Sequence, residues 1–127
     1  MANILVTGAT GFIGTNLIQK LINSKNSISI FTQKKSNIQN IKNIISKLDV
    51  HQVDLTKFDI VKKSIKEIKP DIIYHLATYG VYNNQISYEK IVKTNIFGTL
   101  NLFNSIYEYG NIEKVINLGS SFEYGPQ

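Results

Sequence analysis

The chain has 127 residues and 43% of them are hydrophobic, which indicates one compact domain with its own core and argues against intrinsic disorder. It has no cysteine and only two histidines, so a disulfide framework and a thiolate metal site are excluded and we expect no metal centre. The net charge of +5 comes from lysines alone. Because the arginine fork that suits phosphate and guanine is missing, we expect no nucleic-acid partner.

Short apolar strands alternate with helical stripes in the first half of the chain. Residues 3–7, NILVT, form a fully apolar strand. A second strand follows over residues 27–32, a polar loop then leads into a weaker helix near 38–47, and a third strand covers 49–53. Between the first two strands, one buried helical stripe is formed by Gly14, Leu17, Ile18, Leu21 and Ile22.

The second half of the chain repeats this alternation. Thr56 and Asp59 have the spacing of a capping box and are expected to open a helix that Pro70 closes. The apolar stripe of this helix consists of Phe58, Val61, Ile65 and Ile68. The elements after it are a fourth strand over 71–77, a long helix over about 86–109 that ends at Gly110, and a fifth strand over 114–119.

Strands and helices that alternate in this way form parallel β-α-β units, whose crossovers are right-handed. We therefore predict an α/β fold: a Rossmann-like, doubly wound parallel sheet with strand order 3-2-1-4-5 and helices on both faces. Residues 1–127 are expected to form one dinucleotide-binding domain.

A glycine-rich turn, VTGATGFIG, joins the first strand to the first helix. Its spacing is G-x-x-G-x-x-G, not the more usual G-x-G-x-x-G. At such a junction, backbone N–H groups and the helix dipole face an anion. We expect Gly8 to let the chain leave the strand tightly, Gly11 to let the backbone approach a pyrophosphate, and Gly14 to bring the helix close to the sheet. A tight turn that needs glycine only for backbone freedom is the alternative.

Five motifs, in order along the chain, resemble one known family. They are TGATGFIG at 7–14, VDL at 53–55, HLAT at 75–78, NIFGT at 95–99 and SSFEYG at 120–125. Together they are similar to the extended short-chain dehydrogenase/reductases, the NAD-dependent epimerase/dehydratase group that acts on nucleotide sugars. The resemblance spans the entire chain. It implies a NAD(P) cofactor and, in a full-length enzyme, a nucleotide-sugar substrate.

The resemblance also implies roles for individual residues. The loop glycines and the amides of Phe12 and Ile13 would hold the pyrophosphate. Asp54 would accept a hydrogen bond from the adenine amino group, with Leu55 beside it, although an Asp after a strand is also a common cap or turn residue. Ala77 would line the cofactor groove.

Three further residues lie in or near the expected groove. Thr78 stands where the family usually has a second alanine, and we expect His75 to pack under the loop rather than to take part in chemistry. Asn95 is expected on a sheet-facing stripe, where a buried amide costs a few kcal/mol unless its hydrogen bonds are met. It must therefore brace neighbouring backbone or hold an ordered water, and in the family the matching Asn does both. The stripe consists of Tyr88, Val92, Asn95, Thr99, Leu102 and Ile106.

The end of the second strand bears on the choice of cofactor. Folds that prefer NAD usually place an acid about 20 residues past the glycines, on the ribose 2′-hydroxyl. Here Thr32 or Gln33 holds that position and Lys34, Lys35 and Ser36 follow, while residues 1–48 contain no acid. We expect Gln33 and Lys34 to contact the cofactor and to favour NADP over NAD, because ammonium and hydroxyl groups suit a 2′-phosphate. Ordinary loop charges are the alternative for the lysines.

Ser120 opens the last motif. In the family, the matching Ser or Thr is catalytic and its hydroxyl hydrogen-bonds the sugar oxygen that is oxidised or reduced; a helix cap or turn role is the alternative. The nucleotide-sugar dehydratases carry Asp and Glu at the next two positions, where this chain has Ser121 and Phe122. Since Glu123 comes one position too late, we expect an epimerase or a 4-keto-sugar reductase.

The family's catalytic tyrosine, with a lysine four residues later, is not in this chain, because no lysine has Tyr four residues before it. We therefore expect an N-terminal cofactor-binding part, truncated after the fifth strand, with little or no turnover alone. The alternative is a non-catalytic module that senses the cofactor's redox state or docks a partner. A serine hydrolase is disfavoured because G-x-S-x-G is absent.

Surface and location follow from the same reasoning. The fifth strand would be a sheet edge with apolar surface exposed near it, which predicts self-association. No apolar run approaches the roughly 18 residues of a membrane span. The start, MANILVTG, lacks the basic flank and long apolar core of a secretion signal. We expect a cytoplasmic protein without a membrane partner.

Overall fold

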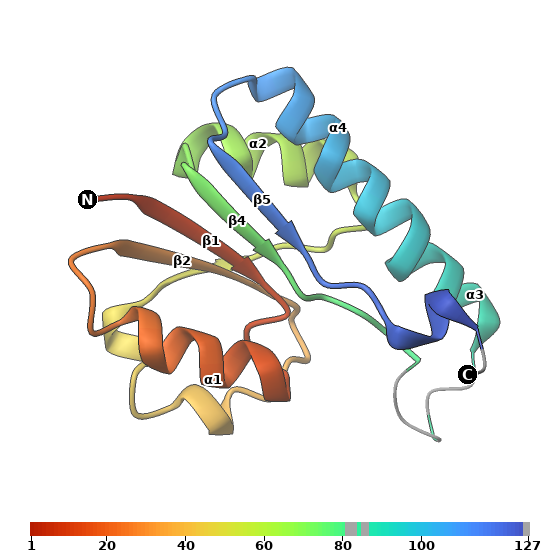
Figure 1. Ribbon diagram of the computed structural model, residues 1–127, viewed down its shortest axis with the longest axis horizontal. Coiled ribbons are helices and arrows are strands. Elements are labelled where there is room, and N and C mark those ends of the chain that lie inside the picture. Colours follow the sequence, from red (N-terminus) through yellow and green to blue (C-terminus); the bar gives the residue numbers. More distant parts are fainter. Residues whose placement is uncertain (81–83, 85–86, 126–127) are drawn as a thin grey trace.

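The computed structural model describes residues 1–80, 84 and 87–125. Its strands form one parallel five-stranded sheet in the order β3-β2-β1-β4-β5 (Figure 1). The predicted strand order is therefore confirmed. The strands are β1 (Asn3–Thr7), β2 (Ser27–Thr32), β3 (Asp49–Gln52), β4 (Ile72–His75) and β5 (Lys114–Asn117).

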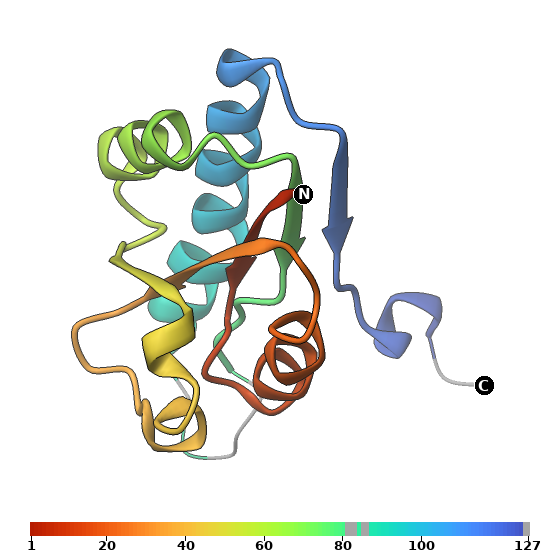
Figure 2. The ribbon, with the colours of Figure 1, turned by 90° about the vertical axis from the view of Figure 1, so that its left-hand side faces the viewer.

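Helices cover both faces of this sheet, as Figures 1 and 2 show: α1 (Phe12–Leu21) lies on one side, and α2 (Phe58–Ile68) and α4 (Thr99–Tyr109) lie on the other. Successive side chains of a strand point to opposite faces. Accordingly, Leu5 of β1 packs in the core cluster under α2 and α4, whereas Ile4 packs in the cluster under α1. β1 thus contributes to two hydrophobic layers.

All five strands run in the same direction, so the loops that follow them meet at one edge of the sheet. In open parallel sheets this carboxyl edge is where ligands bind. At the end of β1, Thr7 pairs with Phe31 of β2 and with His75 of β4. The glycine loop therefore starts in the middle of the sheet, between two neighbouring strand ends.

The helix predicted near 38–47 is absent, and two short 3-10 turns, η1 (Gln39–Ile41) and η2 (Ile45–Lys47), take its place. The amide of Ile41 donates to the carbonyl of Ile38, and that of Ile44 donates to Ile41. Isoleucines spaced by three residues match the three residues per turn of a 3-10 helix. Ile41 is fully buried in the cluster under α1, so packing supports the tighter turn.

The long helix predicted over 86–109 is described from Tyr88 and has three parts: α3 (Tyr88–Ile91), a π-helical segment η3 (Val92–Gly98), and α4. Residue 86 lies outside the described residues. The predicted stripe reaches the core at Leu102, but Tyr88 is 84% exposed and Val92 is 41% exposed. The prediction that these two face the sheet is therefore wrong.

The capping box predicted at the start of α2 is also absent. Lys57 occupies the N-cap position and no side chain caps the helix. Thr56 instead donates its hydroxyl hydrogen to the carboxylate of Asp54. Asp59 lies in the first turn of α2, where a negative charge is favourable to the helix dipole. As predicted, the helix ends before Pro70, at Lys69, whose φ of 51° is left-handed.

Candidate functional site

Two glycines of the β1–α1 loop are required by the fold itself. Gly8 has a φ of +71°, and a Cβ atom there would lie 2.6 Å from the backbone of Leu76 and Ala77 at the end of β4. A Cβ atom on Gly14 would overlap the carbonyl oxygen of Gly8. Gly14 thus brings α1 close to the backbone of its own loop, which refines the expectation that it faces the sheet.

Gly11 differs from the other two. Its φ of −75° and ψ of 172° are open to any residue, and an added Cβ would meet only the carbonyl oxygen of Gly8, at 3.3 Å. Gly11 is the N-cap of α1, no side chain caps the helix, and its first turn contains no acid. Phe12 and Ile13 follow with exposed side chains. Backbone strain does not explain a glycine here, and an added Cβ would make one tight contact, while the helix end is open to an anion.

His75 is buried between the ends of β1 and β4, at 3% exposed. Its Nδ1 lies 2.6 Å from the hydroxyl of Thr7, and its Nε2 lies 2.9 Å from the hydroxyl of Thr99. Burial lowers the pKa of His75 from 6.5 to about 4, so the ring is neutral at neutral pH. The predicted packing role is the one observed.

Asn95 braces the loop after β4. Its Oδ1 accepts from the Tyr79 amide at 2.8 Å, and its Nδ2 donates to the Tyr79 carbonyl at 2.8 Å. The Thr78 hydroxyl donates to the same Oδ1 at 3.3 Å. Asn95 thus makes the backbone brace that was one of the roles considered for it. Ala77 precedes this braced segment, is half-buried, and donates its amide to the Thr7 hydroxyl.

The π-helical segment and α4 contact the loop after β3 and hold its backbone. Asp54 is exposed, and its Oδ1 accepts from the amide and the hydroxyl of Thr56 at 2.9 and 2.8 Å. Leu55 points into the core, so only its backbone lies toward the loop surface. Asn101 donates to the Leu55 carbonyl at 2.9 Å, and an added Cβ on Gly98 would lie 3.1 Å from that of Leu55.

Asn101 and Gly98 were missed by the sequence reasoning. Both residues are near Leu102, which the sequence predicts to face the core. A glycine on a core-facing stripe indicates a close approach, and a polar residue there indicates a satisfied hydrogen bond, so these two residues could have been recognised.

At the end of β2, Thr32 is buried whereas Gln33 and Lys34 are exposed, so Gln33 is the surface residue of the two candidates for the acid's position. The backbone amide of Gln33 donates to the Ser36 hydroxyl at 2.8 Å, and the backbone amide of Ser36 donates back to the backbone carbonyl of Gln33 at 2.9 Å. This closed turn places Lys34 and Lys35 at its tip.

Ser120 is exposed and directly precedes a 3-10 turn, η4 (Ser121–Tyr124). Its amide donates to Oε1 of Glu123 at 2.9 Å, and the Glu123 amide donates to the Ser120 carbonyl at 3.1 Å. A Cβ atom on Gly119 would lie 2.7 Å from the same carboxylate oxygen. Glu123 therefore holds the backbone of Ser120. The side chains of Ser121 and Phe122 lie outside the described part of the chain.

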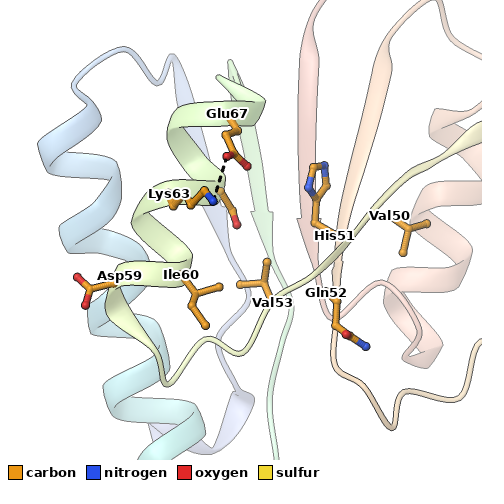
Figure 3. Close-up of a pocket in the computed structure, with 9 residues that line it drawn as sticks. Val50, His51, Gln52, Val53, Asp59, Ile60, Lys63 and Glu67 are labelled. Carbon is orange, nitrogen blue, oxygen red and sulfur yellow. Dashed lines mark ion pairs between the residues drawn. The ribbon is translucent and has the colours of Figure 1, made fainter.

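A groove of about 540 Å³ lies elsewhere, between the edge strand β3 and helix α2 (Figure 3). Lys63 and Glu67 form an ion pair of 3.8 Å on its helical wall, and His51 faces the groove from the strand. None of the residues predicted for the cofactor site lines this groove. The carboxyl edge of the sheet, not this groove, therefore carries the candidate site.

Within residues 1–80, 84 and 87–125, no group of three His, Cys, Asp or Glu side chains is placed to hold a metal ion. The helices in this part of the chain are all too short or too polar to cross a membrane.

The sequence from residue 4 to residue 127 matches the model of the NAD dependent epimerase/dehydratase family. The chain belongs to this family. Its parallel sheet and strand order agree with that membership.

Curated members of the family resemble the chain over most of its length. It is 29% identical over 92% of its residues to CDP-glucose 4,6-dehydratase of Salmonella typhimurium, and 31% identical over 96% to UDP-glucuronic acid decarboxylase 6 of Arabidopsis thaliana. The matched regions are 34% of each of these two proteins. The chain thus spans about a third of the length of the curated relatives it matches.

Solved structures have the same fold. The UDP-Glc/GlcNAc 4-epimerase of Campylobacter jejuni superimposes with a TM-score of 0.87 at 23% identity, over 98% of this chain and 39% of that one. The dTDP-glucose 4,6-dehydratase of Bacillus anthracis, in complex with NAD, gives a TM-score of 0.83 at 25% identity, over 100% of this chain and 40% of that one.

Proposed function

We propose that this chain forms the nicotinamide-cofactor-binding part of a nucleotide-sugar epimerase or 4-keto-sugar reductase. The observation that carries the proposal is Gly11 at the open N-terminus of α1, a glycine that its backbone angles do not require and whose added Cβ would meet a single atom, at 3.3 Å. Space reserved beside helix amides is what the linked phosphates of a dinucleotide need.

The residues present fit such a cofactor. The amides of Phe12 and Ile13 follow Gly11 at the helix end, where the dipole favours an anion. Asp54 is exposed, and Thr56 donates to only one of its two carboxylate oxygens. The other oxygen would accept a hydrogen bond from the adenine amino group. Ala77 and the segment braced by Asn95 would line the nicotinamide side. The cofactor would supply the hydride acceptor or donor, while these residues bind and orient it.

NADP is the proposed form of the cofactor. The tip of the β2 turn presents Lys34 and Lys35 instead of an acid, and Gln33 is the exposed residue at the strand end. A 2′-phosphate next to two ammonium groups is electrostatically favoured, and that gain falls with salt. NADPH should therefore bind more tightly than NADH at low salt, with the difference shrinking at high salt. Equal affinities at both salt concentrations would contradict the preference.

Hydride transfer without loss of water is the proposed reaction class. The related proteins are named for CDP-, dTDP- and UDP-linked sugars. Ser120, held by Glu123, would hydrogen-bond the reacting sugar oxygen. The Asp-Glu pair of the dehydratases is replaced by Ser121 and Phe122. In the full-length protein, incubation with these nucleotide sugars should yield an epimer, or incubation of a 4-keto nucleotide sugar with reduced cofactor should yield the alcohol and oxidised cofactor; a 4-keto-6-deoxy product from a nucleotide sugar would contradict this assignment.

The binding proposal is tested by titrating NADH and NADPH into the wild-type chain and into Gly11→Ala by isothermal calorimetry. A methyl group at position 11 would occupy the phosphate space while adding only one close contact, to Gly8. We expect the variant to fold with nearly unchanged stability and to bind at least about tenfold more weakly, roughly the cost of one or two phosphate hydrogen bonds. Equal binding by both proteins, or none by the wild type, would contradict the proposal.

A further inference from the structure

Three polar side chains form a continuous path through the core at the carboxyl edge. Thr7 ends β1, His75 ends β4, and Thr99 begins α4. The imidazole lies between the two hydroxyls, 2.6 Å from the first and 2.9 Å from the second. Thr7 is fully buried, His75 nearly so, and Thr99 half-buried.

The hydrogen bonds around Thr7 determine the protonation of the ring. The Ala77 amide donates to the Thr7 hydroxyl oxygen at 3.3 Å. If Nδ1 also donated to that oxygen, the buried hydroxyl hydrogen would have no acceptor among these groups. The satisfied arrangement has Thr7 donating to Nδ1 and Nε2–H donating to Thr99. His75 is thus a neutral ring with a defined tautomer.

The two ends of the path lie beside two parts of the candidate site, the glycine loop and the loop after β4, which we call its two walls. Thr7 precedes Gly8, which packs against the backbone of Leu76 and Ala77. Thr99 lies four residues after Asn95, which holds both backbone groups of Tyr79. The path therefore connects the glycine loop to the helix that positions the β4 loop.

Sheet cohesion alone does not require these polar groups. Thr7 and His75 are already register partners in the β1–β4 ladder. An apolar side chain would fill the space without desolvating an imidazole, a cost that the lowered pKa of His75 reflects. What an apolar side chain cannot supply is a directional link from β1 to α4.

We infer that His75 is a positioning residue that joins the glycine loop to the Asn95-bearing helix, so that both walls of the cofactor groove keep a fixed separation. The test of this inference by cofactor affinity rests on the proposed function, whereas its tests by amide and imidazole nuclear magnetic resonance do not. His75 is buried and acts through its hydrogen bonds to Thr7 and Thr99.

The matched pair of variants is Thr99→Val and Thr99→Ser. Valine keeps the shape of threonine and removes the acceptor for Nε2–H, whereas serine keeps the hydroxyl. We expect Thr99→Val to weaken cofactor binding about tenfold, as for the loss of one buried hydrogen bond, and Thr99→Ser to restore it to within about twofold. The amide resonances of both Gly8 and Tyr79 should shift in the valine variant of the cofactor-free chain.

A purely structural role would lower the stability of Thr99→Val but leave these resonances and the cofactor affinity of the folded fraction unchanged, which would overturn the inference. Imidazole ¹⁵N shifts of the wild-type chain need no variant: the Nε2–H tautomer is expected, and the Nδ1–H tautomer would overturn it. If the wild type binds no cofactor, the proposed function fails, while the Gly8 and Tyr79 shifts still decide the inference in either direction.

Discussion

Gly8, Gly11 and Gly14 differ in what surrounds the position of the missing Cβ atom. At Gly8 and Gly14 that position is filled by backbone, of the segment that follows β4 in one case and of the glycine loop in the other. At Gly11 it faces one carbonyl oxygen at a distance that a small shift relieves. The first and third glycines thus serve folding, and we propose that the second leaves room for a ligand.

The stability of Gly14→Ala tests this division. Helix propensity alone would make alanine about 1 kcal/mol better than glycine within α1. The overlap with the Gly8 carbonyl should reverse the sign and lower the free energy of unfolding by about 1–3 kcal/mol. Denaturant unfolding of Gly14→Ala, with Gly11→Ala and the wild type for comparison, measures this change in the free energy of unfolding. A stabilised Gly14→Ala protein would show that the loop relaxes around the methyl group.

His75 makes stability depend on pH. Burial lowers its pKa from 6.5 to about 4, so in that range the unfolded chain binds a proton that the folded chain does not. The free energy of unfolding should therefore fall as the pH drops from about 6.5 to about 4, by about 3 kcal/mol from this group.

Denaturant unfolding of the wild type and of His75→Gln at neutral pH and at pH 4 isolates that contribution, because the two proteins share every other ionisable side chain. The wild type should lose about 3 kcal/mol more than the variant between neutral pH and pH 4. Parallel losses would mean that the imidazole is solvated in the folded chain.

At the scale of elements, the segment from η3 to α4 fixes the loops after two strands. Asn95 binds Tyr79 after β4, while Gly98 and Asn101 contact Leu55 after β3. The helix is thus a support beneath both sides of the candidate site, and its polar residues are positioned by what they hold.

Asn101→Ala should expose this support, with Asn104→Ala as its control. Asn104 lies on the same helix and is exposed, so the gain in helix propensity is the same for both. Loss of the bond to the Leu55 carbonyl should make Asn101→Ala less stable than the control by about 1–2 kcal/mol. Hydrogen exchange of the Asp54–Thr56 loop should also be faster. Identical stability and exchange would rule out the bracing role.

Element types were predictable where burial and period agreed. β1 and β2 are runs of buried residues, and the stripe of α2 at Val61 and Ile65 is fully buried. The α-helix predicted near 38–47 is wrong because isoleucines three residues apart fit a 3-10 turn as well as an α-helix. The π-helical register of η3 could not be predicted, because it depends on loops that are distant in sequence.

In the candidate site, sequence reasoning identified the residues whose type is constrained by chemistry, such as the glycines and Asn95. It could not decide which partner each would have. Asp54 accepts from Thr56 in a local turn, which was the alternative considered for it, and Glu123 holds the Ser120 amide; both contacts depend on how the loops turn. Asn101 was missed since nothing local marks its long-range partner Leu55.

At the scale of the whole molecule, the centre of the sheet is buried, whereas the solvent-facing side of η3 and α4 carries exposed apolar side chains. Ile96, Leu100, Phe103 and Tyr107 are exposed at helical spacing. Apolar surface of this kind favours association, and we expect the isolated chain to self-associate as its concentration rises.

Leu100→Lys should weaken that association, whereas Ile60→Lys, which changes an exposed isoleucine on α2 in the same manner, should not. Sedimentation velocity over a range of concentrations measures both variants against the wild type. A monomeric wild type at high concentration, or equal effects of the two lysines, would contradict the expected surface.

The most direct test of the central claim is a crystal structure of this chain grown with NADP⁺ or NAD⁺. We expect the pyrophosphate beside Gly11, with its oxygens about 2.7–3.2 Å from the amide nitrogens of Phe12 and Ile13. Dinucleotide bound elsewhere, or a glycine loop that remains free of it at saturating concentration, would contradict the assignment of this edge of the sheet.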